Sequence, residues 1–250
     1  MPRPEDDYLW PFAGRAPILV LAALTVATLL FFNLFPQIDI AVSRLFFEEQ
    51  PCAAAGKICG SFPLSSSPIV ASIRQVLQVT PVLLAILLLL AILWRILSRR
   101  SLAHPFDRAG LAAVATLVLG AGALVNVILK EHWGRPRPLL TDLFGGPYPF
   151  VPAGHITHYC ASNCSFVSGE AASAFWLVAL ATLTPSRYRV PALIAALAVA
   201  SATSLLRVAF GGHYLSDVML GALLSLFIFA CLATLIRSLT SPQPSDHIRS

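Results

Sequence analysis

Six long apolar runs dominate this chain of 250 residues. Each approaches the roughly 20 residues that an α-helix needs to cross the roughly 30 Å hydrocarbon core of a bilayer. The runs cover residues 17–35, 79–96, 109–129, 168–183, 191–209 and 215–236. They predict an all-α, polytopic membrane protein in which six transmembrane helices form a single domain over residues 1–250.

The composition agrees with a membrane protein. Apolar residues make up 57% of the chain and charged residues 12%, whereas soluble domains average roughly 45–50% and about 25%. An ordinary soluble enzyme and a disordered chain are both excluded. The net charge of +5 does not indicate a nucleic-acid partner, because the cytoplasmic loops of membrane proteins carry an excess of Lys and Arg.

The basic residues also predict how the spans are oriented. Alternating sides along the six expected helices divides them into two groups. The larger group lies in the N-terminus, two short loops and the C-terminus: Arg3, Arg15, Arg95, Arg99, Arg100, Arg108, Arg187, Arg189, Arg237 and Arg249. The smaller group lies on the opposite side: Arg44, Lys57, Arg74, Lys130, Arg135, Arg137 and Arg207. We therefore expect both termini in the cytoplasm and two outer segments, at residues 36–78 and 130–167.

Four of the five cysteines fall in these outer segments. Cys52 and Cys59 lie in the first and Cys160 and Cys164 in the second, whereas Cys231 lies inside an apolar run. Because disulfides persist in oxidising compartments, two close pairs on one side favour two disulfides in a periplasm-like space. The alternative is that a pair binds a metal ion together with loop histidines.

The second outer segment contains three histidines, His132, His155 and His158. The simplest interpretation is that they are exposed loop residues. Two other roles remain open, as metal ligands for His155 and His158 or as proton donors and acceptors for all three.

A cluster of cations follows the third apolar run. Lys130, Arg135 and Arg137 fall within eight residues at the predicted membrane boundary, which is typical of an anion site or a headgroup anchor. Basic side chains that merely extend from a span end to the interface are the alternative. The interleaved Gly134 and Pro136 break the helix and favour a rigid turn that aims the two arginines.

The fourth run opens with Ser168, Gly169 and Glu170. Ser168 is a suitable N-cap, and the free N–H groups behind it form an anion site at the positive end of the helix dipole. The same residues could simply start a helix. Glu170, however, is a carboxyl group at the edge of the hydrocarbon region, where ionisable groups are functional candidates.

A third group lies between the last two runs. Gly211 and Gly212 permit a tight turn, and His213 and Asp217 stand four residues apart, close behind Arg207. A carboxylate that bonds one imidazole nitrogen leaves the other nitrogen free as a nucleophile or base. We expect His213 and Asp217 to form such a pair.

Together the three groups resemble the type 2 phosphatidic acid phosphatase (PAP2) superfamily of integral membrane lipid phosphatases. Its pattern is K-x6-R-P, then P-S-G-H, then S-R-x5-H-x3-D. The residues that match are Lys130, Arg137, Pro138, Ser168, Gly169, Arg207, His213 and Asp217. The departures are Val167 for proline, Glu170 for histidine and Leu206 for serine.

The resemblance implies a role for each matched residue. His213 would attack phosphorus and become phosphohistidine, oriented by Asp217. Lys130, Arg137 and Arg207, with the start of the helix at Ser168 and Gly169, would hold the phosphoryl oxygens. These cations can neutralise the transferred group without Mg²⁺, so we expect neither a metal nor another cofactor.

Glu170 stands where the family has the histidine that protonates the leaving alkoxide. A glutamic acid can do the same if its carboxyl group is protonated. His132, His155 and His158 are the second choice for this role, and Arg135 is a further accessory candidate.

The stretch around Asn163 to Glu170 is most similar to bacterial lipid A phosphatases within the family. This resemblance implies a hydrolase in the bacterial inner membrane, with its active site facing the periplasm and a phosphorylated lipid as substrate. Undecaprenyl pyrophosphate, phosphatidylglycerophosphate and phosphatidate remain alternative substrates. A lipid phosphotransferase and a non-enzymatic lipid-binding protein are the competing functions, and no obligate protein partner is inferred.

Overall fold

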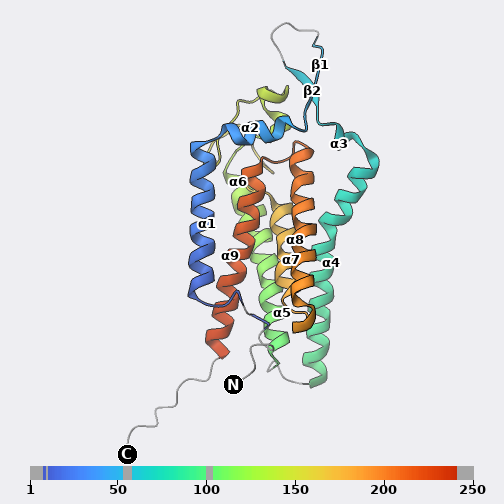
Figure 1. Cartoon of the computed structure of the whole chain (residues 1–250), viewed down its shortest axis with the longest axis vertical. Coiled ribbons are helices and arrows are strands. Elements are labelled where there is room, and N and C mark those ends of the chain that lie inside the picture. Colours follow the sequence, from blue (N-terminus) through green and yellow to red (C-terminus); the bar gives the residue numbers. More distant parts are fainter. Residues whose placement is uncertain (1–7, 10, 53–57, 100–103, 241–250) are drawn as a thin grey trace, which may run out of the picture.

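The computed structural model describes residues 8–9, 11–52, 58–99 and 104–240. The axes of its long helices lie roughly side by side, with consecutive helices alternating in direction, and build an elongated bundle (Figure 1). Arg3, Lys57, Arg100 and Arg249, which entered the count of basic residues, lie outside the described residues.

The apolar runs fold into the helices of this bundle. They are α1 (Arg15–Leu34), α4 (Pro68–Arg99), α5 (Pro105–Thr116) continuing through the π-helical turns of η2 (Leu117–Leu129) into α6 (Lys130–His132), α7 (Gly169–Ala181), α8 (Ser186–Ala209) and α9 (Leu215–Thr240). Large apolar side chains such as Leu19, Leu87 and Ile194 remain exposed on their outer faces, as contact with lipid requires.

Five of these helices are long and apolar enough to cross a membrane. They are Arg15–Leu34, Pro68–Ser98, Pro105–His132, Ser186–Ala209 and Leu215–Leu239. The expected helical membrane architecture is confirmed. The sixth expected span is α7, an apolar helix of only 13 residues, or about 20 Å at 1.5 Å per residue.

α7 lies in the middle of the bundle. It packs against α4, α5, η2, α8 and α9, and 8 of its 13 residues are buried. Most of these are alanines, whose small side chains allow neighbouring helices to approach closely. Trp176 fills the space beside α5 and donates its indole N–H to the carbonyl oxygen of Ala113 over 2.5 Å.

α4 starts earlier than its apolar run. The run begins near residue 79, but the helix begins at Pro68 and carries Arg74 and Gln78 on its added turns. The upper part of α4 leans away from the bundle in Figure 1, and Pro81 lies inside the helix, where proline removes a backbone hydrogen bond. Two polar side chains are thereby placed on a helix that also faces lipid.

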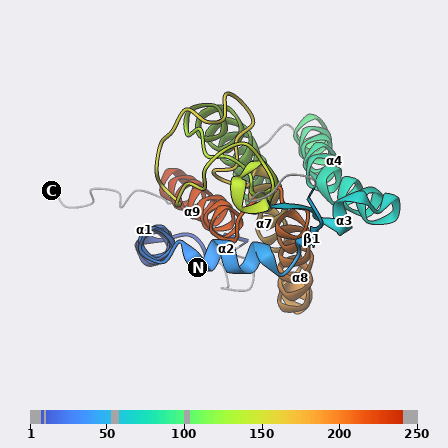
Figure 2. The same ribbon diagram turned by 90° about the horizontal axis from the view of Figure 1, so that it is seen from above.

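A cap of short elements covers one end of the bundle. α2 (Gln37–Arg44) lies across this end (Figure 2). β1 (Glu48–Gln50) pairs with β2 (Cys59–Ser61) as an antiparallel hairpin, followed by α3 (Pro63–Ser66). η3 (Pro138–Leu140) and η4 (Asp142–Phe144) belong to the segment between α6 and α7.

Both expected disulfides lie in this cap. Cys52 is bonded to Cys59, and Cys160 to Cys164, while Cys231 is a free thiol. The prediction of two disulfides is confirmed, and these cysteines are therefore not thiolate ligands of a metal ion.

Candidate active site

A cavity of about 350 Å³ lies where α4, η2, α6, α7 and α8 meet. Its lining combines charged, polar and apolar residues. The lining residues are Arg74, Gln78, Val82, Leu117, Ala121, Gly122, Asn126, Lys130, Arg137, Asn163, Gly169, Glu170, Ser173 and Arg207. All three of the expected phosphate-binding cations, Lys130, Arg137 and Arg207, are thus brought together from sequence positions up to 77 residues apart.

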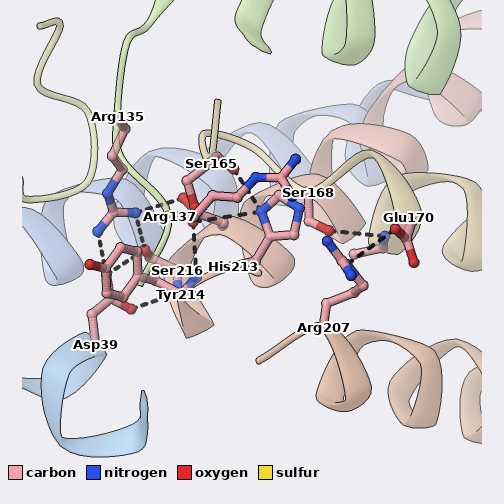
Figure 3. Close-up of polar contacts among 12 residues, drawn as sticks. Asp39, Arg135, Arg137, Ser165, Ser168, Glu170, Arg207, His213, Tyr214 and Ser216 are labelled. Atoms are coloured by element: carbon pink, nitrogen blue, oxygen red, sulfur yellow. Dashed lines mark hydrogen bonds and ion pairs between the residues drawn. The ribbon is translucent and has the colours of Figure 1, made fainter. Parts of the chain in front are cut away.

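Glu170 is the one carboxylate in the lining, and two arginines bind it. Arg74 donates from Nη2 to Oε1 over 2.6 Å and from Nε to Oε2 over 3.1 Å. The Nε atom of Arg207 lies 3.2 Å from the same Oε1 (Figure 3). Two guanidinium groups this close favour the ionised carboxylate form of Glu170.

The start of α7 forms the wall beside Glu170. Ser168 is the N-cap, and its hydroxyl oxygen accepts from the backbone N–H of Ala171 over 3.3 Å, as its residue type predicts. A Cβ atom at Gly169 would overlap the side chain of Asn126. Glycine is therefore required for the helix start to lie against η2.

Arg137 is fixed by a residue that the sequence patterns do not single out. Its Nη2 donates to both the carbonyl oxygen and Oδ1 of Asn163, over 2.9 and 2.8 Å. Asn163 has a φ of 49°, in the left-handed region that asparagine tolerates better than most residues. The disulfide between Cys160 and Cys164 closes the short loop that contains it.

His213 is buried beside this cavity, in the tight turn between α8 and α9. Gly211 has a φ of 63°, and a Cβ at Gly212 would lie 2.6 Å from the guanidinium of Arg207. The two glycines therefore let the turn pass directly against Arg207. In Figure 3, His213 lies between the Arg207–Glu170 pair and a second group of residues, which consists of Asp39, Arg135, Tyr214 and Ser216.

The imidazole of His213 has one bonded and one free nitrogen. Nδ1 donates to the carbonyl oxygen of Ser165 over 2.8 Å. Nε2 is buried and has no hydrogen-bond partner among the described residues. Burial, opposed by Asp217 and assisted by the charge of Arg207, lowers the pKa of His213 from 6.5 to about 4. The ring is therefore neutral near pH 7, with a lone pair on Nε2.

Asp217 does not bond the imidazole directly, in contrast to our expectation. Its Oδ2 lies 3.8 Å from Nδ1 of His213 and instead accepts from the Ser165 hydroxyl over 2.5 Å and the Tyr214 backbone N–H over 3.0 Å. Its Oδ1 accepts from Arg135 over 2.6 Å. These donors occupy the carboxylate of Asp217, and the Nδ1–H group of His213 donates its hydrogen bond to the main-chain carbonyl oxygen of Ser165.

Arg135 lies on the far side of Asp217 and not in the cavity. It is fully buried and donates to Asp39 over 2.8 Å and to the hydroxyl of Ser216 over 2.9 Å, in addition to Asp217. Its guanidinium also lies 4.3 Å from the centre of the Tyr214 ring. Burial raises the pKa of Asp39 despite the opposing charge of Arg135. This accessory candidate therefore supports the carboxylate behind His213.

The three loop histidines lie outside the cavity. His132, His155 and His158 are exposed, and Nδ1 of His132 bonds the carbonyl oxygen of Ile128 over 2.8 Å. None of the three is among the lining residues. Glu170 is therefore the better placed of the proton-donor candidates.

Sequence reasoning did not assign five residues of this region: Arg74, Asn126, Asn163, Asp39 and Ser165. Asn126 did carry a signal, because it is a polar residue inside the third apolar run. Arg74 was sorted to the outer side by charge alone. Nothing local marks Asp39 or Ser165, whose partners are distant in the sequence.

Comparison with known proteins adds relatives to this geometry. The PAP2 superfamily model matches residues 110–240. The lipid A 4'-phosphatase of Rhizobium leguminosarum is 46% identical over 230 residues, which are 88% of this chain and 96% of that protein. The lipid A 4'-phosphatase of Francisella tularensis subsp. novicida is 30% identical over 191 residues, covering 76% and 82%.

A solved structure shares the fold. The crystal structure of the transmembrane PAP2 type phosphatidylglycerolphosphate phosphatase from Bacillus subtilis matches with a TM-score of 0.54. The match covers 89% of this chain and 94% of the other, at 20% sequence identity. The helical arrangement is thus shared by two chains whose sequences have diverged widely.

Proposed function

The chain belongs to the PAP2 superfamily, and from this membership and its similarity to lipid A 4'-phosphatases we propose that it removes a phosphate group from a lipid A-type glycolipid. One observation carries the proposal. A buried neutral histidine with a free Nε2 lies beside a cavity that four cations line, namely Arg74, Lys130, Arg137 and Arg207. A nucleophile next to concentrated positive charge is what phosphoryl transfer requires.

In the proposed reaction, Nε2 of His213 attacks phosphorus. The N–P bond forms as the ester P–O bond breaks, and the lipid leaves as an alkoxide that takes a proton from Glu170. Water then attacks phosphorus as the N–P bond breaks. Inorganic phosphate leaves as H2PO4⁻ with the protons of the water, and the imidazole of His213 returns to its neutral form. Lys130, Arg137 and Arg207 neutralise the charge on the equatorial oxygens, together with the backbone N–H groups at the start of α7.

The network behind His213 keeps the imidazole ready for this attack. The carbonyl oxygen of Ser165 accepts a hydrogen bond from Nδ1–H, and its hydroxyl donates a hydrogen bond to Asp217. Arg135 and Asp39 hold Asp217 in turn. When the imidazole becomes cationic in the phosphorylated state, the negative charge of Asp217 at 3.8 Å stabilises it.

The apolar part of the cavity supports a lipid substrate. Val82 on α4 and Leu117 and Ala121 on η2 are apolar members of the lining. Both helices belong to candidate membrane spans. We therefore propose that the lipid enters sideways from the bilayer, between α4 and η2, with its phosphate leading.

The cap supports an orientation in the membrane. We propose that α7 completes a set of six membrane helices, that both termini are cytoplasmic, and that the cap faces the periplasm from the bacterial inner membrane. The two disulfides in the cap support this orientation, because an oxidising compartment preserves them.

A substrate panel tests the proposed function. Purified protein would be incubated, with and without EDTA, with lipid A, undecaprenyl pyrophosphate, phosphatidylglycerophosphate and phosphatidate. We expect release of inorganic phosphate, fastest from lipid A and unaffected by EDTA. Faster release from another lipid would identify that lipid as the preferred substrate. Phosphate found on an acceptor lipid would indicate a transferase, and no release from any lipid would indicate a binding protein.

A further inference from the structure

Arg74 makes the tightest contact in the cavity, although it comes from outside the segment that carries the family motifs. It reaches Glu170 across 96 residues of sequence with a two-point ion pair, at 2.6 and 3.1 Å. Gln78 lies one turn further along α4, and its Oε1 accepts a hydrogen bond from Nη2 of Arg74 over 3.2 Å. Arg74 is thus aimed into the cavity by both partners.

The exposure of the two side chains shows which of them is accessible. The side chain of Arg74 is 27% exposed and that of Glu170 12%. The guanidinium of Arg74 also lies 5.9 Å from the centre of the Phe210 ring. Arg74 is therefore the more accessible partner of the ion pair.

We propose that Arg74 is a fourth phosphate-binding cation, and that a bound phosphate group replaces Glu170 on its binding face. The proposal rests on the proposed function in one respect, namely that the cavity binds a phosphate group. It adds a substrate contact from α4.

The chemistry of the ion pair supports an exchange of partners. An arginine presents two parallel N–H groups that match a carboxylate and a phosphate equally well. The carboxylate oxygens of Glu170 thus lie on the face of Arg74 that phosphoryl oxygens would take. A dianion attracts the guanidinium groups of Arg74 and Arg207 more strongly than a single carboxylate does.

The exchange also explains how Glu170 acquires its proton. When both arginines turn to the phosphate, Glu170 loses its cationic partners and gains a negatively charged neighbour, so it takes up a proton from water. That proton passes to the alkoxide as the P–O bond breaks. The carboxylate then pairs with Arg74 again once inorganic phosphate has left.

The test separates contact with phosphate from support of Glu170. The Ki of inorganic phosphate would be measured as a competitive inhibitor of p-nitrophenyl phosphate hydrolysis, with Glu170→Gln as the background. We expect Glu170→Gln alone to lower the Ki, because the competing carboxylate is gone. Adding Arg74→Gln should then raise the Ki about tenfold or more, as expected for losing a charged hydrogen bond.

Two further variants complete the design. Arg74→Lys in the Glu170→Gln background keeps the charge but loses the two-point contact. Its Ki should lie between that of Glu170→Gln alone and that of Glu170→Gln combined with Arg74→Gln. Arg44→Gln is the matched control, because Arg44 is an exposed arginine on α2 outside the cavity lining. This substitution should leave the Ki unchanged.

The outcomes are distinct. If the Arg74 replacements leave the Ki at the value of the Glu170→Gln variant, Arg74 only supports Glu170 and the inference is overturned. A higher Ki in Glu170→Gln alone would also overturn it, since Glu170 would then not compete with phosphate. If the unchanged protein neither hydrolyses a phosphate ester nor binds phosphate, the proposed function fails instead.

Discussion

His213 donates a hydrogen bond from Nδ1 to the main-chain carbonyl oxygen of Ser165 over 2.8 Å, while the carboxylate of Asp217 lies 3.8 Å from the same nitrogen. Ser165 links the two groups, because its hydroxyl donates to Asp217 over 2.5 Å. A carbonyl oxygen can only accept a hydrogen bond. The tautomer with a free Nε2 is therefore fixed without a direct bond between histidine and aspartate.

This arrangement predicts an intermediate effect of Asp217→Asn. We expect kcat to fall about 100-fold, less than the roughly 10⁴-fold loss in sites where the carboxylate bonds the imidazole itself. The Ser165 carbonyl still holds the ring, but the charge that stabilises the imidazolium is lost. Turnover of p-nitrophenyl phosphate, with thermal unfolding as a check on folding, measures the effect. A loss as complete as that of His213→Ala would contradict this account.

The burial of His213 predicts an unusual pH profile. Because its pKa is lowered to about 4, Nε2 keeps its lone pair between pH 4 and the ordinary imidazole value of 6.5, and loses it as the pH falls through about 4. The acid limb of kcat/KM for p-nitrophenyl phosphate, corrected for the dianion fraction of the substrate, should lie near pH 4. A limb near 6.5 would mean that His213 titrates like an exposed imidazole.

Glu170→Gln should affect substrates according to their leaving groups. Glutamine keeps the shape of the side chain but cannot give up a proton. We expect a large loss of kcat with a lipid phosphate, whose alkoxide leaves poorly, and a smaller loss with p-nitrophenyl phosphate. Equal losses on the two substrates would mean that Glu170 only positions phosphate or the start of α7.

The sequence predicted the residues of the site better than their contacts. Lys130, Arg137, Arg207 and His213 could be found because fixed spacings place them at the ends of apolar runs. Arg135 was recognised as a cation beside them, but its role depends on Asp39, which lies 96 residues earlier. Such a pairing arises only when α2 folds across the bundle.

The helices show the same division between local and tertiary information. The apolar runs locate α1, α8 and α9 because contact with lipid and packing against other helices both favour apolar residues along these segments. α4 extends ten or more residues beyond its run, since Arg74 is stabilised there by Glu170 on α7. α7 covers Gly169–Ala181 within the run of residues 168–183, and neighbouring helices surround it on several sides.

Thiol labelling after reduction tests the proposed orientation. Cys52, Cys59, Cys160 and Cys164 should react with a membrane-impermeant maleimide from the periplasmic side only after a reductant is added, because both pairs are disulfides. Labelling from the cytoplasmic side alone would invert the topology. Single-cysteine variants at residues 52 and 160 would report the two outer segments separately.

The most direct measurement of the mechanism is a search for phosphorylated His213. Purified protein would be mixed with ³²P-labelled lipid A and quenched in alkali within one turnover. We predict a base-stable, acid-labile phosphoryl group on the wild-type chain that is absent from His213→Ala and maps to the peptide containing His213. Rapid phosphate release with no labelled protein, or the same label in His213→Ala, would contradict His213 as the nucleophile.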